Sequence, residues 1–211
     1  MCSFGQRCLK TRSGKTVCVQ GQKQNYPEGS PQHEVDKEET FVNSPLHDAC
    51  RKGNLTRAAH RGSKDVFEFL VCMGANVSQV GKKGDKVLHW GCKGGHLGMV
   101  KYLLSLSSVD INSSGKMGVT PLMWAALYGY RDIFQFLVRM GASLSQLDVK
   151  RNNILHRASL AGRLEMVKYI IRQNTVNINA RNKDGETAAM LAKSSNKSRV
   201  YNFLVLNGAV Q

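Results

Sequence analysis

Only a few residues of this 211-residue chain have types and spacings that could support chemistry. Residues 13–16 read Ser-Gly-Lys-Thr, which is similar to the end of a phosphate-binding loop, where backbone N–H groups and the lysine hold phosphate oxygens. The first glycine of such a loop would stand where Leu9 is, and no strand pattern precedes it. We therefore expect a solvated basic tail here and no nucleotide site.

Cysteines near the N-terminus raise the question of a zinc site. Cys2, Cys8, Cys18 and His33 are separated by six, ten and fifteen residues, whereas zinc sites usually take their ligands in close pairs. The six cysteines include no C-x-x-C pair, and no secretory leader is visible. We therefore expect no metal, no cofactor, and the reduced thiols of a cytoplasmic or nuclear protein.

A catalytic role is not indicated by the remaining polar residues. The acidic residues are sparse and scattered, and no Ser/His/Asp arrangement or pair of acids emerges. No apolar run approaches the length of about 18 residues that would cross a bilayer. The sequence predicts a chain that has no catalytic residues, is not an enzyme and does not span a membrane.

One segment of the chain, residues 118–150, recurs at a constant interval. Its leucine at position 122 has equivalents at Leu55, Leu88, Leu155 and, weakened, Ala189, with steps of 33, 34, 33 and 34 residues. A period in the low thirties, with one turn and two short helices per unit, is typical of a stacked solenoid. One unit cannot bury its apolar face alone, so neighbouring units must cover it.

The repeated segments resemble the ankyrin repeat. The family pattern T-P-L-H-x-A-A-x-x-G-H, followed by V-x-x-L-L-x-x-G-A, has counterparts in VLHWGCKGGHLGMVKYLLS, TPLMWAALYGYRDIFQFLVRMGA and ILHRASLAGRLEMVKYIIRQ. The resemblance covers about residues 44–211 and implies an all-α ankyrin-repeat solenoid of stacked helix-turn-helix units with hairpin loops. The units of residues 55–211 lie near 55–83, 84–117, 118–150, 151–184 and 185–211.

The central unit shows how the sequence sets its helices. Thr120 can cap a helix over 121–128, with a proline in the first turn, where its missing N–H is not needed. Gly129 can end this helix in a left-handed conformation. A second helix over 131–140 carries its apolar residues at the spacing of one helical face.

The start of the chain is irregular. Residues 1–43 show no helical or strand period and are expected to form a disordered leader. Residues 44–54 look like the opening of a repeat, with Leu46 in the key position, yet Leu55 takes that position again nine residues later. About 24 residues of a full unit are missing, which suggests a splice or deletion form of a longer ankyrin protein. The alternative is that residues 44–54 form a divergent N-terminal cap helix.

Positive charge is concentrated on the repeats. Of the net charge of +15, residues 1–43 contribute +1, from six Lys and Arg against five Asp and Glu, and the rest contributes +14, from 24 against ten. Several basic residues fall in the connections between units: Lys82, Lys83, Lys86, Lys116, Lys150, Arg151, Arg181 and Lys183. Stacked units align equivalent loop positions, so these charges would form a stripe that attracts an acidic or mixed protein segment, nucleic acid or a phosphoinositide. Solvated hairpin tips are the alternative.

Two tryptophans occupy one position of consecutive units. Trp90 and Trp124 have Arg57 and Arg157 at the equivalent positions on either side, which predicts a ladder along the inner helices. Such aromatic side chains often dominate binding hot spots. Family members offer the alternative that this position packs between inner helices. Further contact candidates at the ends of the inner helices are Lys93, Leu127, Tyr128 and Leu160.

The resemblance also implies roles for two other kinds of residue. His47, His89 and His156 stand at the histidine position of the motif, where the ring would hydrogen-bond loop backbone between units. The segment LSLSSVDIN at 104–112 is similar to segments in which ankyrin asparagines become hydroxylated, so Asn112 is a candidate modification site.

The sequence thus predicts a monomeric, non-catalytic scaffold or adaptor, cytoplasmic and/or nuclear, that binds an acidic or mixed protein partner. Binding of nucleic acid or anionic lipid by the same basic stripe is the alternative, and it is less favoured because no recognised nucleic-acid motif accompanies the charge. A third interpretation is a truncated form of a larger ankyrin protein without independent activity.

Overall fold

The computed structural model describes residues 6–10, 16–20, 54–78, 80–81 and 84–210, with side chains from Leu55 onward. Apart from residue 54, the predicted partial repeat or cap at 44–54 lies outside this part of the chain. Whether the first unit is shortened by splicing therefore stays a prediction.

The described part of the chain holds ten α-helices in five pairs, each an inner helix followed by an outer helix. The inner helices are α3 (Asn54–Arg61), α5 (Val87–Gly94), α7 (Pro121–Tyr128), α9 (Ile154–Leu160) and α11 (Ala188–Ser194). The outer helices are α4 (Lys64–Cys72), α6 (Leu97–Leu104), α8 (Arg131–Arg139), α10 (Leu164–Arg172) and α12 (Ser198–Leu206).

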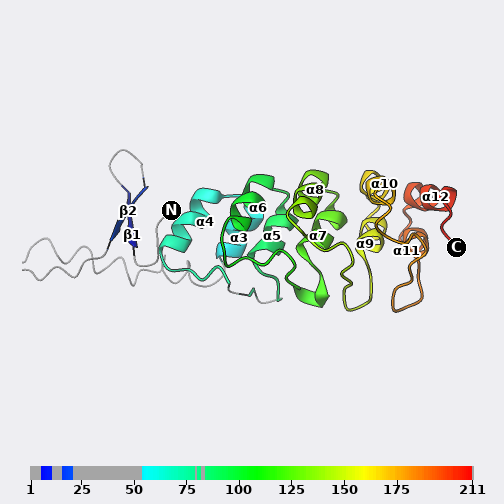
Figure 1. Cartoon of the computed structure of the whole chain (residues 1–211), viewed down its shortest axis with the longest axis horizontal. Coiled ribbons are helices and arrows are strands. Elements are labelled where there is room, and N and C mark those ends of the chain that lie inside the picture. Colours follow the sequence, from blue (N-terminus) through cyan, green and yellow to red (C-terminus); the bar gives the residue numbers. More distant parts are fainter. Residues whose placement is uncertain (1–5, 11–15, 21–53, 79, 82–83, 211) are drawn as a thin grey trace, which may run out of the picture.

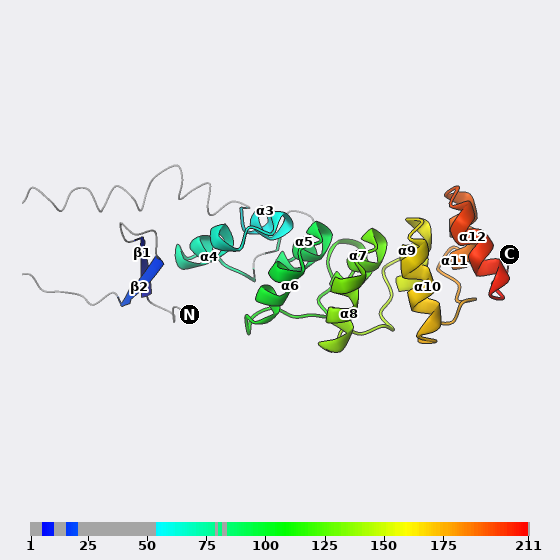
Figure 2. The same ribbon diagram turned by 90° about the horizontal axis from the view of Figure 1, so that it is seen from above.

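The pairs, numbered here as units 1 to 5, stack in one row, with the loops that connect successive pairs along one edge (Figure 1 and Figure 2). The inner helices contact one another in chain order. The stack is the all-α solenoid that the sequence predicts. Among the described helices, none has the length and apolar content needed to cross a bilayer.

Unit 3 has the helix caps that the sequence predicts. The Thr120 hydroxyl accepts a hydrogen bond from the Met123 N–H at 3.3 Å, which satisfies a first-turn donor of α7. Gly129 ends the helix in the left-handed region, with a φ of 81°. The apolar side of α8 is buried through Ile133, Phe134 and Leu137.

The core runs along the whole stack and combines small side chains on the inner helices with large ones on the outer helices. Ala125 of α7 and Phe134 of α8 are both essentially inaccessible to solvent. The small side chains let neighbouring inner helices approach closely. At Gly94 of α5, for example, an added Cβ atom would lie only 2.8 Å from the carbonyl carbon of His60 in α3. Each unit thereby covers the apolar face of the next.

Backbone hydrogen bonds join the hairpins of successive units. The Val149 N–H donates to the Met117 carbonyl at 3.0 Å, and the Lys183 N–H donates to the Lys150 carbonyl at 2.7 Å. The short 3₁₀ helix η1 (Lys116–Gly118) forms part of the unit 3 hairpin. At the turning position, units 2, 3 and 5 have glycines with positive φ, whereas unit 4 has Arg151 with a φ of 60°. The hairpin tips therefore form one continuous edge.

The N-terminal segment departs from the sequence analysis. The strands β1 (Gln6–Lys10) and β2 (Thr16–Gln20) form an antiparallel pair within the segment that the sequence analysis expects to be a disordered leader. The disorder of residues 1–43 as a whole stays a prediction. In this pair Gln6 lies opposite Gln20, Cys8 opposite Cys18 and Lys10 opposite Thr16. The threonine and valines of β2 favour a strand. A strand does precede the Ser-Gly-Lys-Thr segment, although Leu9 still stands where the phosphate-binding loop needs glycine.

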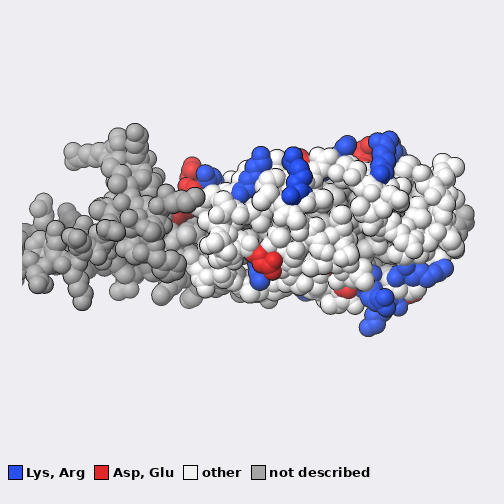
Figure 3. All heavy atoms as spheres, in the orientation of Figure 1, with Lys and Arg blue, Asp and Glu red and all other residues white. Residues whose placement is uncertain are grey.

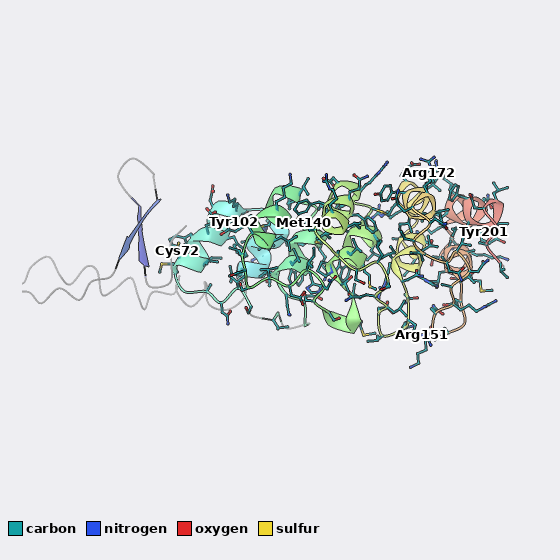
Figure 4. All side chains as sticks on the ribbon, viewed as in Figure 1. Cys72, Tyr102, Met140, Arg151, Arg172 and Tyr201 are labelled. Carbon is teal, nitrogen blue, oxygen red and sulfur yellow. The ribbon has the colours of Figure 1, made fainter. Side chains whose placement is uncertain are left out.

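The two cysteines that the structure describes in the repeats differ in state. Cys72, at the end of α4 and labelled in Figure 4, is disulfide-bonded, so the expectation of reduced thiols is wrong for this residue. Cys92 in α5 is free and fully buried. Burial raises the pKa of the Cys92 thiol, which keeps it protonated and unreactive.

His89 joins unit 2 to the hairpin that follows it, as the motif predicts. Its Nδ1 accepts a hydrogen bond from the Lys86 N–H at 3.1 Å. Its Nε2 therefore carries the proton and donates to the carbonyl oxygens of Ser113, at 3.0 Å, and Val119, at 3.1 Å. The neutral ring thus connects a helix start to a loop 24 to 30 residues away.

His156 has the same role in unit 4. The Asn153 N–H donates to its Nδ1 at 3.3 Å, and its Nε2 donates to the Glu186 carbonyl at 3.2 Å. The structural role predicted for the motif histidines is confirmed at these two positions, whereas His47 lies outside the described residues. Burial lowers the pKa of both rings below their ordinary value, more strongly than the backbone hydrogen bonds raise it.

These histidines should make the protein less stable in mild acid. In the unfolded chain both rings take up a proton near their ordinary pKa of 6.5, whereas the folded protein resists protonation until a lower pH. The free energy of unfolding should therefore be highest above that value and fall as the pH drops toward the folded pKa. Urea titrations at about pH 7.5 and about pH 5.5 measure the difference. The variant H89Q should show a smaller acid loss, and a loss equal to that of the unsubstituted protein would contradict this role.

Candidate partner-binding surfaces

The two tryptophans lie on the neighbouring inner helices α5 and α7, and the ladder with Arg57 and Arg157 stays a prediction. Trp90 and Trp124 are partly buried and pack against the core. Between them lies the ammonium group of Lys93, 4.3 Å from the centroid of the Trp90 ring and 3.8 Å from that of Trp124. Both indole N–H groups are inaccessible to solvent, and neither has a hydrogen-bond acceptor among the described residues. The tryptophans thus act largely by enclosing a cation.

Lys93 is held by a buried carboxylate as well as by the two rings. Its Nζ donates to Asp85 at 2.7 Å, and the two side chains are only 11% and 2% exposed. The other carboxylate oxygen of Asp85 accepts the Lys116 N–H at 2.9 Å, which ties the pair to the next hairpin. The charge of Lys93 is thus neutralised inside the stack, and a partner contact by this residue stays a prediction.

Arg157 is sequestered in a similar way in unit 4. Its guanidinium donates to the carboxylate of Asp148, which is fully buried. Burial by itself would raise the pKa of Asp148, but hydrogen bonds from Asn152 and the charge of Arg157 outweigh that effect and hold the pKa below its ordinary value. This ionised carboxylate organises the hairpin of unit 4, so Arg157 is a structural group and the prediction of a partner contact is not supported.

A row of stacked aromatic rings continues from Trp124 to the C-terminal end of α7 and the turn after it. Tyr128 stacks on Trp124, with ring centroids 5.9 Å apart, and on Tyr130, with centroids 5.8 Å apart. Tyr128 and Leu160 are each 37% exposed, whereas Leu127 is half-buried. Of the predicted contacts at the helix ends, Tyr128 and Leu160 are thus open to a partner.

The hairpin tips hold most of the predicted basic contacts. Lys116, Lys150, Arg151 and Lys183 are exposed, and Lys86 is half-buried at the start of α5. Lys82 and Lys83 lie outside the described residues. One tip cation has a weak partner, because Lys150 lies 3.4 Å from the carboxylate of Asp184 and both side chains remain more than half exposed. Figure 4 shows Arg151 extending from the tip of its hairpin.

The structure adds apolar residues that the sequence analysis missed. Met117 and Val149 are 49% and 55% exposed, and the backbone hydrogen bond between them places them side by side. We use "hairpin edge" for the joined tips with these residues and their basic neighbours: Lys116, Met117, Val149, Lys150, Arg151 and Lys183. The sequence did carry a signal for Met117 and Val149. A residue at the tip of a hairpin needs no contact with the core, so an apolar residue there indicates a candidate contact with a partner.

Figure 3 shows that positive side chains gather at two edges of the face it displays. One group lies along the edge over α6, α8 and α10, and the other lies around the hairpins of units 4 and 5. The basic surface is therefore not confined to the hairpin edge, which is where the sequence analysis expected a basic stripe.

Asn112 lies in the hairpin between units 2 and 3 and joins it to the following unit. Its Oδ1 accepts the Ser143 N–H at 2.8 Å, and its Nδ2 donates to the Gly141 carbonyl at 3.4 Å. Hydroxylation of Asn112 stays a prediction.

The described residues contain no group of three or more His, Cys, Asp or Glu side chains placed to hold a metal ion.

Family comparisons match the repeats. The family described as "Ankyrin repeats (3 copies)" matches residues 55–148, and "Ankyrin repeats (many copies)" matches residues 141–192. Together these matches span more than half of the chain.

Several curated proteins are similar over the same region. Palmitoyltransferase AKR1 of Lachancea kluyveri is 29% identical over 167 residues, which are 75% of this chain and 22% of the relative. Putative palmitoyltransferase ZDHHC13 of Danio rerio is 28% identical over 139 residues, 66% of this chain and 21% of the relative. The nuclear factor NF-kappa-B p105 subunit of Rattus norvegicus is 32% identical over 135 residues, 61% of this chain and 14% of the relative.

The chain spans less than a quarter of the length of these relatives, whose names describe different activities. The likeness therefore concerns the repeats and not the activity of any whole relative. The recurring motif, the stacked helix pairs and the family matches agree that this chain belongs to the ankyrin-repeat family.

Proposed function

We propose that this chain is a non-catalytic protein-binding module whose hairpin edge binds a partner segment carrying both acidic and apolar side chains. Ankyrin repeats indicate a protein-interaction domain. The observation that carries the proposal is the hydrogen-bonded row of hairpin tips, in which the exposed Met117 and Val149 are flanked by exposed cations.

The backbone bonds between tips make this edge suitable for recognition. Because the carbonyl of Met117 and that of Lys150 each accept an N–H from the following hairpin, the exposed side chains are carried on a fixed frame. A fixed frame reduces the entropy that is lost when a partner binds. The apolar pair can contribute buried area, while the cations add steering and selectivity for acidic partners.

A protein partner fits the hairpin edge better than a polyanion does. Nucleic acid and anionic lipid are bound mainly by charge, and their binding weakens steeply with salt. The hairpin edge instead places two large exposed apolar side chains at its centre, and the Asp184 carboxylate beside Lys150 would repel a polyanion. We place the module in the cytoplasm or nucleus and take it to act as a monomer.

Affinity capture from cell lysate with the full chain tests the proposal, at two salt concentrations and with nuclease treatment. We expect a defined protein to survive both treatments. The variant M117S/V149S should bind it at least about fivefold more weakly, which corresponds to a loss of about 1 kcal/mol of binding free energy. M140S, which removes a 52%-exposed methionine at the end of α8, is the matched control and should bind normally.

Two results would contradict the proposal. Capture that disappears with nuclease or salt would indicate a polyanion partner, and capture of nothing above background would favour a truncated form without independent activity.

A further inference from the structure

An open cleft lies at the other ends of the inner helices, away from the hairpin edge. It has a volume of about 310 Å³ and is lined by residues of three successive units, including Tyr128, Arg163 and Arg199. Tyr128 is the last residue of α7, and Arg163 directly precedes α10. The cleft therefore exists only because units 3, 4 and 5 are stacked.

Arg163 is held in place by the unit before it. Its Nε donates to the Leu127 carbonyl at 3.1 Å. Its aliphatic part lies over Gly129, where a Cβ atom would be 3.0 Å from the Arg163 Cδ. The terminal nitrogens of the guanidinium make no hydrogen bond or ion pair with any described residue. A guanidinium fixed at Nε and free at its outer nitrogens is prepared to bind an anion in a bidentate way.

Arg199 breaks a pattern in the preceding units. It is the second residue of α12, a position that is acidic in α4, α8 and α10 (Asp65, Asp132 and Glu165) and is Gly98 in α6. An acidic residue is favourable at this position, because the first turn of a helix carries partial positive charge, whereas an arginine is unfavourable there. Arg199 is exposed and has no bonded partner among the described residues. Residues that break a local rule without local compensation are expected at functional positions.

The carboxylate in the cleft does not neutralise the two arginines. Glu165 accepts a hydrogen bond from Lys168 at 2.8 Å. That bond, followed by the charge of Lys168, lowers the pKa of Glu165. Glu165 is therefore already paired with Lys168, whereas neither guanidinium group of the cleft forms an ion pair with a described residue.

We propose that this cleft binds an acidic side chain of an extended protein segment, with the carboxylate held by Arg163 and Arg199. The guanidinium fork matches the geometry of a carboxylate. The cleft is larger than a single carboxylate, and the ring of Tyr128 and the side chains of Leu164 and Met166 supply an apolar wall for a neighbouring side chain. The preferred segment therefore carries Asp or Glu next to an aliphatic or aromatic residue.

The shape of the site favours a peptide over a polyanion. A phosphate lattice is bound through many separate contacts on an extended surface. This site instead offers two unpaired cations in one hollow with an apolar wall. It lies at the opposite ends of the inner helices from Met117 and Val149, so it goes beyond the proposed function and is tested independently of it.

A library of random 12-residue peptides displayed on phage tests the inference against the full chain, with the variant R163Q/R199Q used to remove peptides that bind elsewhere. We expect the remaining peptides to be enriched in Asp or Glu beside an aliphatic or aromatic residue. The selected peptides are then synthesised with a fluorescein label, and their affinity is measured by fluorescence anisotropy. R163Q and R199Q should each weaken binding at least about tenfold.

Two further variants separate loss of binding from loss of fold. R199E restores the acidic residue of the preceding helices, so it should unfold at the same or a higher temperature while losing peptide binding. R139Q removes an exposed arginine at the end of α8 and should leave binding unchanged. The inference is overturned if no peptide depends on the cleft arginines, or if R139Q weakens binding as much as R163Q does. The variant M117S/V149S, which changes the hairpin edge, should leave these peptide affinities unchanged. The cleft and the hairpin edge are thereby tested independently.

Discussion

Replacing Gly94 by alanine is expected to destabilise the repeat stack by about 2–3 kcal/mol, the upper part of the range for overpacked interiors. The added Cβ would overlap the carbonyl oxygen of His60 and lie 2.8 Å from its carbonyl carbon. Backbone atoms cannot rotate away as a side chain can, so α3 and α5 would have to move apart. That movement would expose the apolar contacts between units 1 and 2.

The matched control is the same substitution at Gly98, the second residue of α6. No atom lies within 4 Å of a Cβ built there, and the position is exposed. Alanine should therefore stabilise this helix by about 0.5–1 kcal/mol, because it restricts the unfolded chain more than glycine does.

Urea titration followed by circular dichroism measures both changes. The expected result is a lower midpoint for G94A and an equal or higher midpoint for G98A. A G94A protein as stable as the unsubstituted chain would show that α3 and α5 do not approach as closely as the structure places them.

The architecture was predictable because it depends on a local pattern that recurs. The leucine spacing fixed the number and phase of the units, and the bounds of α7 follow from Thr120, the proline after it and Gly129, each of which acts within one helical turn. The motif histidines were predictable for the same reason, since His89 and His156 bond the same kind of loop backbone in successive units.

The state of the cations could not be predicted, because it depends on contacts between units. The sequence analysis named Lys93 as a contact candidate at the end of an inner helix, and the stack places its ammonium group between two indoles and against Asp85. One sequence signal for the position of Asp85 was available. Gly115 occupies the repeat position that Asp148 has in unit 4. Because glycine has no side chain, it leaves room for the carboxylate of Asp85. The cleft with Arg163 and Arg199 could not be predicted for the same reason, because its lining residues come from three units.

Removing the carboxylate of Asp85 is expected to destabilise the fold by about 3–5 kcal/mol, the usual effect of breaking a buried ion pair from one side. Asp85 is 1% exposed and accepts from both the Lys93 ammonium and the Lys116 N–H. In D85A the ammonium would remain between Trp90 and Trp124, whose rings attract it much less than a carboxylate does. The hairpin of unit 3 would also lose an acceptor.

The double variant D85A/K93M distinguishes this ion pair from simple packing. Once both charges are removed, methionine can still fill the space between the indoles, so the double variant should recover at least half of the stability that D85A loses. The exposed pair Lys64 and Glu68, 3.5 Å apart, is the control, because E68A should change stability by less than about 1 kcal/mol. If the losses from D85A and K93M simply add within about 0.5 kcal/mol, the two residues do not act as a pair. A coupling well above that value would show that units 2 and 3 are joined by a buried charge enclosed by aromatic rings.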